Sequence, residues 1–111
     1  MNWITLIDEL QLDKIKELSK QKAQLIFKHS TRCHISSMVK SRLERSTQPG
    51  SVDFHYLDLI QHRKLSNKVA EEFGVYHESP QVLLIKNGEC VYDESHSGIG
   101  MNEIIEQVAL S

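Results

Sequence analysis

One cysteine, Cys33, lies at the point where a predicted strand meets a predicted helix. The apolar run AQLIFKH, residues 23–29, is typical of a buried strand, and the helical pattern CHISSMVKSRLERS begins at the cysteine itself. The first N–H groups of a helix have no intrahelical partner, and the helix dipole is positive at that end. A sulfur placed there is stabilised as the thiolate, which is the form that attacks disulfides. The chemistry expected of Cys33 is therefore nucleophilic thiol–disulfide exchange.

Ser36 occupies the position, three residues after Cys33, where a dithiol enzyme carries its second cysteine. An internal disulfide cannot form across this corner, so an external thiol must complete any exchange that Cys33 begins. The polar neighbours Thr31, Arg32 and His34 fit a half-exposed corner, and the last two can add positive charge beside the sulfur. The alternative is that Cys33 is a small buried core residue.

The second cysteine, Cys90, is far from Cys33 in the sequence, and the pair lacks metal-ligand spacing. Two cysteines alone cannot close a zinc site, and the six histidines do not pair at helical spacing. We therefore expect no metal site. Cys90 is predicted to be a structural or surface residue, and a role as a secondary resolving thiol is the alternative.

Length and composition indicate one globular domain spanning residues 1–111. The chain is 40% hydrophobic and 25% charged, and its formal net charge of −2 gives no general attraction to nucleic acid or anionic lipid. Its first residues contain acids and no basic region, which argues against a signal peptide. No apolar run approaches the roughly 20 residues of a membrane helix. We expect a cytoplasmic monomer with no nucleic-acid or membrane partner.

Strand and helix patterns alternate along the chain, which predicts an α/β fold. The segment of residues 5–20 is either a strand-like start followed by a helix from about Asp13, or one irregular helix. Further strands are expected at 23–29 and 52–59, and helices from 33 and over 62–74. The helix from 33 has a predicted apolar stripe of Ile35, Met38, Val39 and Leu43.

A hairpin and a helix complete the predicted order. The runs QVLLIK and ECVYDE flank Asn87-Gly88, a strong type I′ turn signal, and GIGMNEIIEQVAL has a helical apolar face. The first crossover should be parallel, and the last two strands antiparallel. These elements predict a central mixed sheet of four or five strands with helices on both faces. Ser79-Pro80 opens the first hairpin strand, where proline costs no ladder bond, and local sequence leaves its cis or trans state open.

The whole pattern resembles a thioredoxin-fold protein. The segment AEEFGVYHESPQVLLIKNGE, residues 70–89, is similar to the thioredoxin succession of helix end, Gly-Val, cis-proline, apolar strand and Asn-Gly hairpin. Gly98 stands where thioredoxins carry a glycine before the last helix, and Cys33 and Ser36 occupy the two ends of the C-x-x-C motif. The resemblance implies a single thioredoxin-like domain in which Pro80 is cis.

Within that superfamily, FKHSTRCHIS resembles the monothiol bacilliredoxins, whose signature has proline where this chain has His34. The resemblance implies that Cys33 is the nucleophile and that Ser36 replaces the resolving cysteine and donates a hydrogen bond to its sulfur. Ser79 would present backbone groups that align the substrate disulfide. The residues expected to bind substrate are Thr31, Arg32, His34, Ser79 and Pro80.

The implied activity is the removal of bacillithiol, a small thiol that carries two malate carboxylates, from mixed disulfides on proteins. The implied partners are S-bacillithiolated proteins, and bacillithiol or another redoxin would regenerate Cys33. No bound cofactor is expected, because bacillithiol acts as a co-substrate. Arg32, Lys28 and Lys86 are candidates for binding an anionic ligand, although the two lysines fit ordinary exposed strand positions equally well.

Two other functions are compatible with the sequence. A redox-inactive thioredoxin-like adaptor would bind proteins through the Cys33–Pro80 surface, with the thiol incidental. A glutaredoxin-like iron–sulfur carrier would need a Cys-Gly-Phe-Ser motif, and the corresponding residues here are CHIS.

Overall fold

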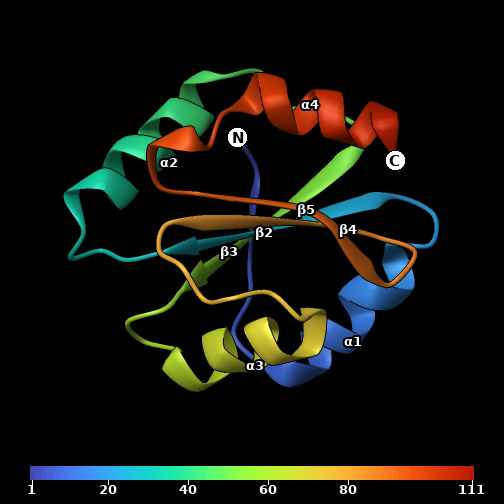
Figure 1. Ribbon diagram of the computed structural model, residues 1–111, viewed down its shortest axis with the longest axis horizontal. Coiled ribbons are helices and arrows are strands. Elements are labelled where there is room, and N and C mark those ends of the chain that lie inside the picture. The colour runs from blue at the N-terminus through green and yellow to red at the C-terminus, as the bar shows by residue number, and fades with distance from the viewer.

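A five-stranded mixed sheet runs through the middle of the molecule, with α2 and α4 on one face and α1 and α3 on the other (Figure 1). The computed structural model describes residues 1–111. The elements are β1 (Trp3–Thr5), α1 (Glu9–Leu18), β2 (Ala23–His29), α2 (His34–Arg45), β3 (Val52–Asp58), α3 (Arg63–Phe73), β4 (Gln81–Lys86), β5 (Glu89–Ser95), the 3₁₀ turn η1 (His96–Gly98) and α4 (Met101–Leu110). The predicted α/β class, the mixed sheet and the helices on both faces are confirmed.

The strand order is β1-β3-β2-β4-β5. β2 pairs in parallel with β3 and antiparallel with β4, while β4 and β5 form the predicted antiparallel hairpin. Asn87 and Gly88 have φ of 53° and 78°, and a type I′ turn requires positive φ at both positions. β2 is thus the central strand, and its two neighbours run in opposite directions.

Two hydrophobic clusters lie on the two faces of the sheet. Phe27 and Leu84 belong to the cluster beneath α2 and α4, whereas Ile26 and Leu83 belong to the cluster beneath α1 and α3. Every residue of β2, and all of β4 except Lys86, is buried. This double-sided burial explains why both strands are nearly continuous apolar runs instead of alternating ones.

Trp3 ties the N-terminal strand to α2. Its ring stacks on Phe27 with centroids 5.4 Å apart, and its indole Nε1 donates a hydrogen bond to the Glu44 carboxylate at 2.8 Å. The indole therefore satisfies its one polar group while the rest of the ring covers the core.

Of the two alternatives for residues 5–20, the structure has a strand followed by a helix, but the helix begins at Glu9 and not at about Asp13. Asp8 caps α1 by accepting from the Gln11 backbone N–H, and the Gln11 side chain accepts from the Asp8 backbone N–H. This reciprocal capping box fixes the start at Glu9. It also turns Leu10 outward, with 78% of its surface exposed, and leaves room for the short strand β1 before the helix.

The apolar stripe predicted for α2 is partly wrong. Val39 and Leu43 are buried, but Ile35 and Met38 are 44% and 49% exposed, and the third residue facing the core is Ser36. The helix is therefore rotated so that a serine, rather than Ile35, points inward. The contacts of that serine, described below, account for the rotation.

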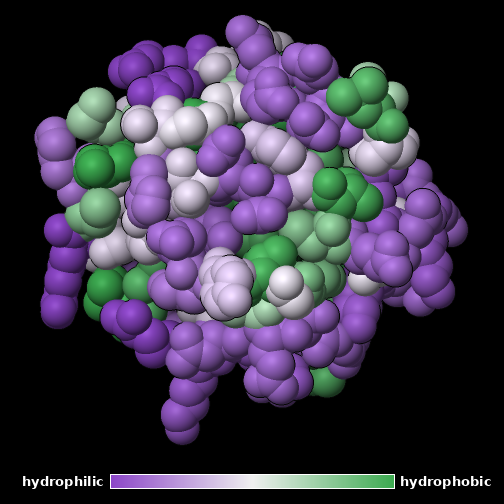
Figure 2. All heavy atoms as spheres, in the orientation of Figure 1, coloured by the Kyte–Doolittle hydropathy of each residue, from purple (hydrophilic) through white to green (hydrophobic).

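The surface seen in Figure 2, which has the orientation of Figure 1, is mostly hydrophilic and is interrupted by small separate hydrophobic patches. None of the helices combines the length and the hydrophobicity required to cross a bilayer.

Replacing Leu43 with alanine should lower the free energy of unfolding by about 2–5 kcal/mol, because it leaves a cavity between α2 and the sheet. Met38→Ala, on the exposed side of the same helix, should change it by no more than about 0.5 kcal/mol. Urea unfolding of both variants measures the difference, and equal losses would contradict the rotation of α2.

Candidate active site

The end of β2 and the beginning of β4 lie at the same edge of the sheet. Their antiparallel register pairs Lys28 with Gln81, so the next position along β2, His29, lies opposite Pro80. Cys33 follows β2 after a short turn, and Pro80 immediately precedes β4. The structure thus brings the two sequence segments that carry the predicted site to one edge, visible at the left of Figure 1.

Cys33 is the N-cap residue of α2. Its backbone is extended, with φ −106° and ψ 119°, and its N–H donates to the Ser30 carbonyl at 3.1 Å, which closes the turn. The first backbone bond of the helix runs from Ser37 N–H to the Cys33 carbonyl. The thiol is half-buried and makes no capping hydrogen bond, so the first amides of the helix remain free beside it. The thiol is therefore not sealed in the core.

Ser36 is fully buried, and its hydroxyl contacts the residues at the end of β2. Oγ accepts a hydrogen bond from Ser30 N–H at 3.0 Å and lies 2.7 Å from His29 Nδ1. It makes no hydrogen bond to the Cys33 sulfur, contrary to the expectation from the resemblance. Burial lowers the pKa of His29, which favours the neutral ring at this contact. Ser36 thus fixes the turn that carries Cys33, and its part in exchange stays a prediction.

The other predicted substrate-binding residues line the same edge. Thr31, Arg32 and His34 are exposed around Cys33. The Ser79–Pro80 peptide bond is cis, as the resemblance implied, and Pro80 is buried. The backbone N–H and carbonyl of Ser79 make no hydrogen bond within the chain, and its buried hydroxyl oxygen has no partner either. The backbone N–H and carbonyl of Ser79 are therefore unpaired within the chain.

Lys28 is not the exposed strand residue that the sequence allowed. Its side chain is completely buried on the α3 side of the sheet, and its ammonium donates to the Ser66 carbonyl at 3.0 Å and to His77 Nδ1 at 3.2 Å. Burial lowers the pKa of Lys28 to about 8. Lys28 consequently cannot contact an anionic substrate. The three apolar residues directly before it, Leu25, Ile26 and Phe27, occupy both faces of the strand and were the signal that this lysine also lies inside.

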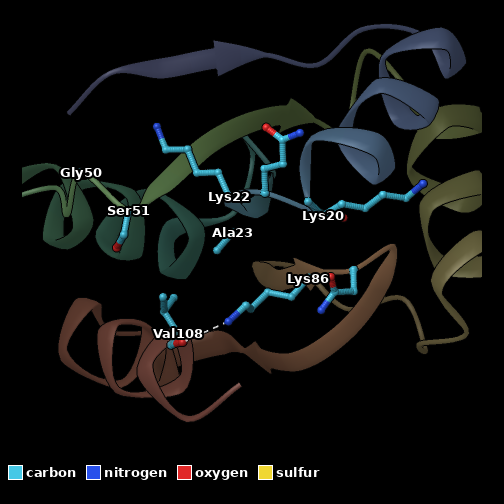
Figure 3. Close-up of a pocket in the computed structure, with 10 residues that line it drawn as sticks. Lys20, Lys22, Ala23, Gly50, Ser51, Lys86 and Val108 are labelled. Carbon is cyan, nitrogen blue, oxygen red and sulfur yellow. Dashed lines mark hydrogen bonds between the residues drawn. The ribbon is translucent and has the colours of Figure 1, made fainter.

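The position of Lys86 also argues against its predicted role in binding an anionic ligand beside Cys33. It lies at the far end of β4 from Pro80, about 20 Å away at the usual rise of an antiparallel strand. There it lines an open cavity of about 540 Å³ and donates to the Val108 carbonyl (Figure 3). Its ammonium also donates to the Ser111 carbonyl at 2.6 Å. The other lysines of this cavity, Lys20 and Lys22, form ion pairs with carboxylates. The cavity is lined by neither cysteine and lies apart from Cys33.

Cys90 lies near the hairpin turn, opposite Ile85 and thus also at the far end of β4. A disulfide requires Cα atoms within about 7 Å, which this separation from Cys33 excludes. Burial raises the pKa of the Cys90 thiol to about 11, and Sγ donates to the Tyr92 carbonyl. Cys90 is thus a half-buried residue of the hairpin, and the sequence had predicted a structural or surface residue.

Comparisons with known proteins identify the family of the chain. The family model described as monothiol bacilliredoxin BrxC matches residues 4–104. The chain belongs to the monothiol bacilliredoxin family. That match spans both segments of the site, the turn with Cys33 and the loop that ends at Pro80.

Solved structures share the same fold. A protein assigned as an oxidoreductase with a thioredoxin fold is 28% identical with a TM-score of 0.83, over 96% of this chain and 93% of its own. Thioredoxin from Malassezia sympodialis is 15% identical with a TM-score of 0.75, over 98% of this chain and 90% of its own. Thioredoxin from Schistosoma mansoni is 17% identical with a TM-score of 0.75, over 98% of this chain and 94% of its own. Family and fold together indicate a thiol redox function for this bacilliredoxin.

Ser36→Ala should destabilise the protein by about 1–3 kcal/mol, because it leaves the Ser30 N–H and the His29 ring buried without their partner. Ser37→Ala, on the exposed side of the same helical turn, should change the free energy of unfolding by at most about 0.5 kcal/mol. Urea unfolding compares the two, and an equally small effect would mean that the Ser36 hydroxyl does not hold the turn.

Cys90 should resist alkylation in the folded protein. With a pKa of about 11, only roughly one thiol in a thousand is ionised at pH 8. In a Cys33→Ala variant, iodoacetamide at pH 8 should label Cys90 slowly under native conditions and rapidly in urea, as followed by intact mass. Equal rates in the two conditions would show that Cys90 is accessible and reactive.

Proposed function

We propose that this bacilliredoxin removes bacillithiol from protein mixed disulfides, with Cys33 as its only nucleophile. One observation carries the proposal: a half-exposed thiol caps α2 beside free helix amides, while a buried serine takes the resolving position. The choice of bacillithiol as the small thiol rests on the family, because the residues of the site alone do not distinguish bacillithiol from glutathione.

The first exchange needs one thiolate and one disulfide. Cys33 attacks the bacillithiol sulfur of a protein–S–S–bacillithiol bond, and a new disulfide forms between Cys33 and bacillithiol as the old one breaks. The target sulfur leaves as a thiolate and takes up a proton. The target cysteine is thereby reduced and Cys33 is oxidised, so the number of disulfides is unchanged.

The groups around Cys33 support this step in two ways. The free amides at the start of α2 and the dipole of that helix stabilise the attacking thiolate. Across the sheet edge, the unpaired backbone N–H and carbonyl of Ser79 can bind the extended backbone of the target protein beside the disulfide. Thr31, Arg32 and His34, the exposed neighbours of Cys33 in the chain, are the other residues proposed to bind substrate.

The second exchange must come from outside the chain. Ser36 cannot form a disulfide, and Cys90 lies at the opposite end of β4. Bacillithiol or the thiol of another redoxin therefore attacks the Cys33 adduct and restores the free Cys33 thiol. Bacillithiol is a co-substrate in this scheme, and the partners are S-bacillithiolated proteins.

Cys33→Ala should abolish the release of bacillithiol from a modified target protein, since no other thiol in the chain can attack. Cys90→Ala is the matched control and should turn over at the wild-type rate. Intact-mass measurement follows both the demodified target and the adduct on Cys33, with glutathionylated target run in parallel. Turnover by Cys33→Ala would contradict the proposal.

The adaptor alternative is separated from the enzyme by the reactivity of the thiol. If iodoacetamide modifies Cys33 at pH 6 no faster than it modifies an unstructured cysteine peptide, the thiol is not activated. The protein would then be a binding partner of other proteins and not an oxidoreductase.

A further inference from the structure

A cation without a carboxylate lies inside the protein, next to the loop that precedes Pro80. Lys28 is completely buried, and its ammonium forms no ion pair, only hydrogen bonds to the Ser66 carbonyl and to His77 Nδ1. Burying a charge without a counter-charge is costly, and apolar replacements of buried ionic groups are often neutral or stabilising. Stability of the fold therefore does not explain why β2 carries a lysine here.

The contacts of Lys28 place it under one particular segment, residues 75–80, which joins α3 to β4. Ser66 belongs to α3, and His77 lies in the middle of the segment. The His77 ring must accept the hydrogen bond, because an ammonium can only donate. Ser66 Oγ lies 3.3 Å from the same Nδ1 atom and thus shares this acceptor with the ammonium. The lysine thus joins the central strand, α3 and the segment through one charged group.

Gln81 holds the same segment from the β4 side. Its Nε2 donates to the Tyr76 carbonyl at 2.9 Å, and its Oε1 accepts from the Glu78 N–H at 3.4 Å. The Pro80 carbonyl accepts from His96 N–H at 3.0 Å. Between these fixed points, the backbone N–H and carbonyl of Ser79 make no hydrogen bond within the chain, and neither do those of His77. The network holds the segment on both sides of Ser79 and leaves unpaired the backbone groups that would bind a substrate backbone.

We propose that Lys28, acting through His77, is a positioning residue that holds the 75–80 segment so that Ser79 is presented to the disulfide substrate. The proposal rests on the proposed disulfide exchange. It predicts that Lys28 affects the capture of the target protein and leaves the reactivity of Cys33 unchanged, because the Cys33 turn is fixed separately by Ser36.

The contact also predicts a pH response. A proton on His77 Nδ1 would face the Lys28 ammonium and break the hydrogen bond. The charged groups around His77 are Lys28 from β2, Arg63 from α3 and Glu78 in the segment itself. Burial is the main cause that lowers the pKa of His77, and the positive charges of Lys28 and Arg63 lower it further. The carboxylate of Glu78 acts in the opposite direction and raises this pKa. The segment should therefore be released only in acid, below the ordinary histidine pKa of about 6.5.

The test compares four variants with the wild type. Lys28→Met keeps the length and apolar volume of the buried stem and removes the charge. His77→Leu removes the acceptor, whereas His77→Asn keeps an acceptor near the Nδ1 position and cannot titrate. Lys22→Met is the matched control, because Lys22 is an exposed lysine at the opposite end of the sheet that pairs with Asp53.

Three measurements distinguish positioning from a general structural role. Lys28→Met and His77→Leu should raise KM for the bacillithiolated target about tenfold, the effect of losing one hydrogen bond to a charged group. Iodoacetamide labelling of Cys33 should change less than about twofold, since that small reagent needs no backbone docking. Hydrogen exchange of the 75–81 amides should accelerate about tenfold while the amides of β2 and β3 stay protected.

The His77→Asn variant tests the role of the ring. At pH 7.5 it should match the wild type in KM and in hydrogen exchange, and it should lack the wild-type rise in KM at acid pH. Lys22→Met should behave as the wild type throughout. A His77→Asn variant that keeps the acid rise would overturn the pH response.

The remaining outcomes decide against the positioning role itself. Unchanged exchange of the 75–81 amides in Lys28→Met, or faster exchange throughout the chain, would overturn it. If the wild type fails to demodify any target, the proposed function fails, while hydrogen exchange still decides whether Lys28 holds the segment.

Discussion

The antiparallel pairing of β2 with β4 is the constraint on which the site depends. β2 runs parallel to β3 but antiparallel to β4. Because of the antiparallel pairing, β2 ends at the sheet edge where β4 begins. That reversal brings the thiol-bearing turn against the Pro80 loop, although about fifty residues of sequence separate them. Any change that shifted this register by one residue would exchange the two faces of β2 and separate the site.

Two buried polar side chains hold the two halves of the site, one on each face of the sheet. Ser36 secures the turn before Cys33 from the α2 side, through the end of β2. Lys28 secures the loop before Pro80 from the α3 side. The turn before Cys33 and the loop before Pro80 are therefore held separately, each by a different buried side chain.

The sequence predicted those features whose signals are local. Asn87-Gly88 forces positive φ at two successive residues and so defines the hairpin, and the change from an apolar run to a helical pattern placed Cys33 at a helix start. The Asp8–Gln11 capping box was equally local, but the apolar spacing around Leu10 obscured it.

The features that sequence reasoning missed depend on contacts between distant segments. Lys28 has the residue type of a surface strand position, and only the coverage of its face by α3 and the 75–80 segment makes it buried. Ser36 matched the resolving position of a redox motif, but its hydroxyl bonds to β2 because α2 packs with that residue inward. Pattern reasoning assigned Ile35 to the core for the same reason, since it ranks a residue by its hydrophobicity and not by the partners available to it.

The position of the Trp3 indole makes its fluorescence sensitive to how α2 packs on the sheet. It is the only tryptophan in the chain, it stacks on Phe27 of the central strand, and its N–H is bound to Glu44 in α2. Its fluorescence arises from a single site, where the N-terminal strand, the centre of the sheet and the helix that follows the thiol all meet. The protein thus contains an intrinsic fluorescent probe of how α2, the helix that begins after Cys33, packs on the sheet.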